Sequence, residues 1–182
     1  MIGSKEWFKA FVKSFSKNHN IKNAYNRDKI RGTGISSTEW TSMMSCFLSE
    51  LAPEFASREG YYQEVELGTD FSWYEGKFLD PIVAIEHENN YGGVFKSEIP
   101  KLYTSSAPLK ILITYAWASS KKAKDIEKVK KEIIEKTSDI HKQKVRKNEG
   151  EFLLALGMGE MINPQNCWEG YIFFPGGKYQ KL

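Results

Sequence analysis

Two glutamates that follow a run of apolar residues are the side chains of this sequence best suited to do chemistry. Residues 82–85 are all apolar, and Glu86 and Glu88 come directly after them, two positions apart. An unbroken apolar run of this kind predicts a strand that is buried on both faces. Side chains two positions apart on a strand point to the same face. Two carboxylates that share one face at the end of a buried strand repel each other and are costly to desolvate, so a cation should lie beside them. A divalent metal ion with oxygen ligands is the simplest candidate.

A third carboxylate, Asp70, lies a short way upstream. Asp70, Ser72 and Tyr74 alternate with two aromatic residues, which predicts a strand with one polar face and one core face. If this strand forms a hairpin with the strand at 82–88, Asp70 comes to lie near Glu86. Three carboxylates placed in this way could bind Mg²⁺ or Mn²⁺ together with water molecules. Such an ion can activate a water molecule and stabilise the charge that develops on a phosphate.

The rest of the pattern predicts an α/β fold, with a mixed central sheet flanked by helices on both faces. The capping-box sequence Ser36–Glu39 predicts the start of a helix that ends near Pro53. The polar stretch 19–34 predicts a loop. A strand, a short helix and a strand between 82 and 117 predict a parallel strand pair. Helices are expected over 5–17, 36–53, 97–105 and 120–144, and strands over 61–67, 69–74, 82–88, 110–117, 151–158 and 170–174.

Length and composition favour one domain of 182 residues. Within it we expect an N-terminal helix and basic loop (1–35), a core motif region (36–117), and a basic helix with final strands (118–182). No segment has the length and apolarity of a transmembrane helix or the pattern of a secretion signal. We therefore expect a cytoplasmic protein without a membrane partner. The formal net charge of +3 permits a polyanionic partner but does not require one.

The order of these features resembles the PD-(D/E)XK, or restriction-endonuclease-like, nuclease superfamily. A helix with an early glutamate (Glu39) is followed by a strand, a strand with Asp70, a strand that ends in Glu-x-Glu, a helix and a further strand. The resemblance implies that Asp70 and Glu86 bind a divalent metal. Glu88 takes the place of the usual lysine, which is similar to the Glu-x-Glu form of some restriction enzymes.

The resemblance also implies roles for the neighbouring residues. Glu88 could serve as a third metal ligand or as the general base, and Lys101 from the next helix could supply the missing lysine. Glu39 could support the site through a water molecule or a second metal, although its capping role explains it equally well. The expected activity is metal-dependent hydrolysis of phosphodiester bonds, with DNA as the expected substrate, Mg²⁺ or Mn²⁺ as cofactor, and a homodimer as one possible assembly.

Two other interpretations are compatible with these residues. The missing lysine favours a catalytically inactive nuclease-like fold that binds nucleic acid or protein. A carboxylate-pair sugar hydrolase fits less well, because Glu86 and Glu88 are tied to one strand and cannot easily flank a glycosidic bond. Two groups of basic residues could contact phosphates in either nuclease-like case, namely Lys22, Arg27, Lys29 and Arg31, and Lys142, Lys144, Arg146 and Lys147.

Overall fold

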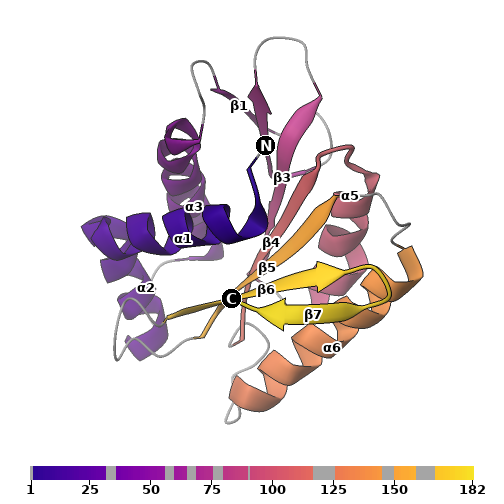
Figure 1. The fold of residues 1–182 in the computed structure, drawn as a ribbon. Helices are drawn as coiled ribbons and strands as arrows, with labels where there is room; N and C mark the ends of the chain where they lie inside the picture. Colours follow the sequence, from indigo (N-terminus) through magenta and orange to yellow (C-terminus); the bar gives the residue numbers. More distant parts are fainter. Residues whose placement is uncertain are drawn as a thin grey trace.

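Within the described part of the chain, seven strands form one mixed sheet and follow one another in chain order (Figure 1). The computed structural model describes residues 2–31, 36–55, 60–64, 69–75, 80–89, 91–116, 126–144, 150–158 and 167–182. The strands are β1 (Gly60–Glu64), β2 (Phe71–Glu75), β3 (Pro81–His87), β4 (Leu109–Tyr115), β5 (Glu151–Gly157), β6 (Trp168–Phe174) and β7 (Lys178–Lys181). The helical segments are α1 (Ser4–Lys17), α2 (His19–Arg31), α3 (Ser37–Leu51), η1 (Ala52–Glu54), α4 (Tyr91–Gly93), η2 (Val94–Glu98), α5 (Ile99–Thr104) and α6 (Ile126–Lys144).

The centre of the sheet is parallel and its two sides are antiparallel. Strands β1, β2 and β3 form an antiparallel meander, and β3, β4 and β5 are parallel. Strands β6 and β7 continue from β5 in antiparallel order. The chain between β3 and β4 includes α5, and the chain between β4 and β5 includes α6, because a parallel connection needs a crossover. The expected parallel pair around 82–117 is therefore confirmed.

Helices cover both faces of the sheet, so the predicted α/β architecture is confirmed. Figure 1 shows α1, α2 and α3 on one side and α5 and α6 on the other. Each side has its own buried apolar cluster. Strand β3 supplies both clusters by alternation: Val83 and Ile85 face the α1–α3 side, whereas Ala84 faces the α5–α6 side. Glu86 is two residues after Ala84 and shares its side.

The predicted loop over 19–34 is wrong for residues 19–31, which form helix α2, and residues 32–34 lie outside the described part of the chain. Its polar composition hides three apolar side chains at helical spacing, Ile21, Ala24 and Tyr25, and all three are buried. The side chain of Asn18 accepts hydrogen bonds from the backbone N–H groups of Asn20 and Ile21, which caps the first turn. A short apolar stripe and one helix cap are therefore enough to form a helix in a segment whose overall composition is polar.

Two smaller differences concern the region after β3 and the end of the chain. The helix expected at 97–105 begins earlier, because α4 and the π-helical turn η2 lead directly into α5. The exposed strand β7 was not expected, since all four of its residues lie at the surface. It follows a turn in which Gly176 and Gly177 adopt positive φ angles. None of the helices among the described residues is long and apolar enough to cross a bilayer.

Gly150 offers a test of the connection into β5. Its φ angle is +83°, and an added Cβ would lie 2.2 Å from the carbonyl oxygen of Pro108, which accepts the backbone N–H of Glu151. We expect Gly150→Ala to lower the free energy of unfolding by about 3 kcal/mol, from backbone strain plus the clash. Urea unfolding followed by circular dichroism measures this loss.

Gly176→Ala is the matched control. Gly176 has a similar φ of +85°, but an added Cβ there meets no atom within 4 Å. This variant should therefore lose only the conformational cost, about 1 kcal/mol. Equal losses in the two variants would show that the contact with Pro108 is unimportant.

Candidate metal centre

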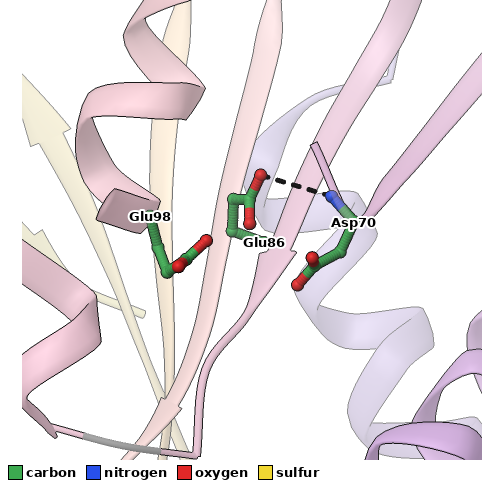
Figure 2. A group of neighbouring side chains, drawn as sticks. All are labelled: Asp70, Glu86 and Glu98. Carbon is green, nitrogen blue, oxygen red and sulfur yellow. Dashed lines mark hydrogen bonds between the residues drawn. The ribbon is translucent and has the colours of Figure 1, made fainter. Parts of the chain in front are cut away.

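Three carboxylates meet near the end of strand β3: one from the residue before β2, one from β3 and one from the end of η2. Asp70, Glu86 and Glu98 each offer one oxygen, and these oxygens all lie within 4.8 Å of one another. Figure 2 shows Glu86 between the other two side chains. The antiparallel register that pairs Phe71 with Ile85 places Asp70 beside Glu86, as the sequence predicts. The helical segments after β3 bring Glu98 close to Asp70 and Glu86.

Backbone hydrogen bonds hold the strand carboxylates in place. The backbone N–H of Asp70 donates to Oε1 of Glu86 over 3.2 Å, the bond drawn in Figure 2. The backbone N–H of His87 donates to Oδ2 of Asp70 over 2.9 Å. One donor is the residue just before β2 and the other is the last residue of β3. The backbone of the two strands therefore orients both side chains. Carboxylate oxygens have further lone pairs, so these bonds leave acceptor capacity for an ion.

Lys101 lies beside the cluster. Its Nζ is 2.7 Å from Oε2 of Glu98 and 3.5 Å from Oε2 of Glu86. Glu98 and Lys101 are three residues apart, so both extend from the same side of the helical run. The hydroxyl of Ser97 also donates to Glu98, over 2.6 Å. The expectation that Lys101 reaches back towards the end of β3 therefore agrees with the geometry.

Burial controls the charge of Glu86. Its side chain has no exposed surface. Burial, a hydrogen bond with Glu98 and the negative charges of Asp70 and Glu98 raise the pKa of Glu86 to about 10, against the opposing effect of Lys101. Burial also raises the pKa of Asp70, although the hydrogen bond from His87 opposes this change. Without a metal ion, Glu86 is therefore protonated at neutral pH.

Glu98 and Lys101 form the charged part of the cluster. Burial alone would raise the pKa of Glu98, but the hydrogen bonds from Glu86, Lys101 and Ser97 lower it below its ordinary value. Burial alone would lower the pKa of Lys101, but its bond to Glu98 and the nearby carboxylates raise it. The ammonium group of Lys101 thus keeps its proton and can donate hydrogen bonds, but it is a poor base.

The donor set is suited to a hard divalent cation. All three groups offer oxygen, which Mg²⁺ and Mn²⁺ prefer. The oxygens of Asp70, Glu86 and Glu98 are separated by no more than 4.8 Å. At that separation a central point lies about 2.8 Å from all three, so each oxygen would move inward by no more than about 0.7 Å to reach the usual Mg–O distance of about 2.1 Å.

Two residues expected at the site lie outside this group of three. Glu88 continues the β3–β4 ladder, because its backbone N–H donates to the carbonyl of Ile113 over 3.0 Å. Its own carbonyl accepts a hydrogen bond from the side-chain hydroxyl of Thr114 over 2.9 Å. Its carboxylate lies against Gly93, where an added Cβ would come within 1.9 Å of Oε2. The roles of Glu88 as metal ligand or base stay predictions.

Glu39 is the other residue outside the group. It is exposed, and its Oε2 accepts hydrogen bonds from the backbone N–H of Ser36 over 2.7 Å and from the hydroxyl of Ser36 over 2.9 Å. The capping box expected from the sequence is therefore confirmed. These bonds lower the pKa of Glu39. Its support of a metal through a water molecule stays a prediction.

Sequence reasoning missed Glu98. The available signal was its position three residues before Lys101 on the helix that follows Glu86. That spacing places a carboxylate and an ammonium on one side of a helix, so any helix that brings Lys101 to the site also brings Glu98.

The basic residues expected to contact phosphates are only partly described. Lys22 and Lys142 lie on α2 and α6, whereas the side chains of Arg27, Lys29, Arg31, Lys144, Arg146 and Lys147 are outside the described part.

Comparison with known proteins does not identify a family. No family model matches the chain, and neither the curated proteins nor the solved structures include a significant match.

The charge state of Glu86 generates a test based on stability. The pKa of Glu86 in the folded protein is about 10, above the ordinary 4.5 expected in the unfolded chain. The stability that this group contributes is therefore complete below the lower value and is lost as the pH rises towards the upper one. Glu86→Gln imitates the protonated form and removes this loss. Without metal, we expect the free energy of unfolding of the variant to exceed that of the original protein by about 4–5 kcal/mol at pH 8, and by about 1 kcal/mol at pH 5.

Urea unfolding at the two pH values measures this difference. Glu135→Gln is the control, because Glu135 is an exposed carboxylate on α6. It should show no comparable dependence on pH. A gain for Glu86→Gln that is equal at pH 5 and pH 8 would contradict the protonated state of Glu86.

Proposed function

We propose that this chain is a divalent-metal-dependent nuclease with a restriction-endonuclease-like arrangement, acting on DNA. The observation that carries the proposal is the convergence of Asp70, Glu86 and Glu98, with Lys101 beside them. The order of elements supports it: the meander β1–β2–β3 is followed by a helix and by the parallel strand β4. The family resemblance of the sequence rests on the same order.

In this proposal the three carboxylates hold Mg²⁺ or Mn²⁺ at the end of β3. A bound ion would activate a water molecule and stabilise the charge that develops on the phosphate. Glu86 gives up its proton when the carboxylates take the ion, because a metal-binding carboxylate must be ionised. Lys101 keeps its proton and donates a hydrogen bond to a phosphate oxygen, which is the role of the lysine that the Glu-x-Glu motif lacks.

The ion pairs of Lys101 also favour a second candidate function. An ammonium group within 3.5 Å of Glu86 and 2.7 Å of Glu98 already offsets part of the negative charge. A nuclease-like fold that binds nucleic acid or protein without cutting could use Lys101 in place of a metal ion. Metal binding separates the two candidates, since only the nuclease requires it.

Metal binding can be measured by thermal unfolding. In the nuclease, we expect 1 mM Mn²⁺ to raise the melting temperature by about 3–6 °C, because the ion binds only the folded state. The rise should be larger at pH 8 than at pH 6, since Glu86 must release a proton. Asp70→Asn should abolish the rise, whereas Glu135→Gln should keep it. No rise with either Mn²⁺ or Mg²⁺ would favour the binding module.

Cleavage tests the activity directly. Purified protein should convert supercoiled, linear or single-stranded DNA to shorter products with Mg²⁺ or Mn²⁺, and not with EDTA. Asp70→Asn, Glu86→Gln and Glu98→Gln should each lower the cleavage rate at least about 100-fold, because each removes a metal ligand. Retained cleavage in all three variants, with Glu135→Gln as the reference, would refute the proposal.

Two further variants assign the residues outside the group. Glu39→Gln should keep cleavage and should weaken only the helix cap. Glu88→Gln should keep most of the rate, because Glu88 lies outside the group of three carboxylates. A loss as large as that of Asp70→Asn would instead make Glu88 a ligand or the base.

A further inference from the structure

A row of lysines lines a groove between helix α1 and strands β6 and β7. Lys5, Lys9, Lys13 and Lys17 are four residues apart, so they form one stripe along the helix. The groove has a volume of about 830 Å³. All four lysines line it and are exposed. The stripe therefore presents four positive charges to one hollow of the surface.

The four lysines of this stripe form no ion pair within the described part of the chain. The acidic side chain in the groove, Glu169, pairs with Lys181 over 2.6 Å and with Lys130 over 3.6 Å. Two exposed lysines of α6 differ, because Lys131 and Lys136 each pair with a glutamate one turn away. The stripe on α1 thus differs from an ordinary solvated helix face.

The spacing and the shape indicate the kind of partner. Successive lysines are about 6 Å apart along the helix, and the row is about 18 Å long. An extended polyanion with regularly repeated charges matches such a row. The apolar floor between the lysines and β6 includes Phe8, Val12 and Trp168. Phe8 approaches β6 so closely that a Cβ on Gly170 would lie 2.8 Å from its ring. The hollow therefore follows from tight packing of α1 on the sheet.

The groove is separate from the candidate metal centre. Helix α1 lies on the opposite side of the sheet from α5 and α6 (Figure 1). Val83 and Ile85 pack in the cluster on the α1 side, whereas Glu86 shares the face of Ala84, which packs in the other cluster. Binding in the groove therefore needs no metal ion and no ionised carboxylate.

We propose that this groove binds the phosphodiester backbone of single-stranded nucleic acid. A positively charged groove that follows the backbone is the usual way in which proteins hold single strands without sequence preference. A membrane surface would require apolar side chains that protrude, whereas Phe8 and Trp168 lie at the bottom and are buried.

Fluorescence anisotropy with a labelled 20-nucleotide oligothymidylate, in EDTA and 0.1 M salt, tests this inference. We expect Lys9→Gln/Lys13→Gln to bind at least about tenfold more weakly than the original protein, and the slope of log affinity against log salt to fall by about 1.4. The control is Lys131→Gln/Lys178→Gln, which removes the same charge from exposed positions outside the groove. It should change the affinity less than twofold. Circular dichroism verifies that both double variants are folded.

Three results would overturn the inference. Equal weakening in the two double variants would indicate only a general charge effect. Tighter binding of a duplex of the same length, still dependent on Lys9 and Lys13, would assign the stripe to duplex DNA. Binding of phosphatidylserine vesicles without binding of the oligonucleotide would assign it to a membrane surface. Because EDTA removes any metal ion, loss of cleavage with retained binding would contradict only the proposed function.

Discussion

The charge of one fully buried carboxyl group links the fold to the candidate site. Glu86 lies at the end of the central strand β3, where solvent cannot stabilise an ionised form. Its neighbours therefore set its charge: a backbone N–H from Asp70, the carboxylate of Glu98 and the ammonium group of Lys101. A proton satisfies this environment in the metal-free protein. A divalent ion would also compensate the charge of Glu86. In that case the carboxylate would be ionised and would bind the ion as a ligand.

The sheet is a rigid frame that fixes the direction of the buried carboxylate. Alternation along β3 sends Val83 and Ile85 into one apolar cluster and Ala84 into the other. Glu86 is thus held between two well-packed layers, with its direction determined by the strand. Sites on regular elements are more precisely placed than sites on loops. The same alternation places the carboxylate cluster and helix α1 on opposite faces of the sheet.

The sequence contained the signals for most of the fold and for part of the site. The buried strands, the capping box and the amphipathic helices could be predicted because each has a strong local period or cap. Asp70 and Glu86 could be placed together, since an antiparallel pair fixes its own register. Helix α2 was missed because its apolar face, Ile21 with Ala24 and Tyr25, is too short to stand out in a polar segment. Glu98 was missed because its place depends on how the chain turns after β3, which no local pattern specifies.

That turn contains the π-helical segment η2 between α4 and α5. A π turn holds about one residue more than an α turn, so it shifts the phase of everything that follows by about 100°. Glu98 and Lys101 come at its end and reach the strand carboxylates with that phase. If the same residues wound at regular α pitch, Glu98 and Lys101 would be rotated by about 100° away from the strand carboxylates, although no side chain at the site would have changed. The pairing of the helix with the strand thus depends on the wider pitch of a single turn.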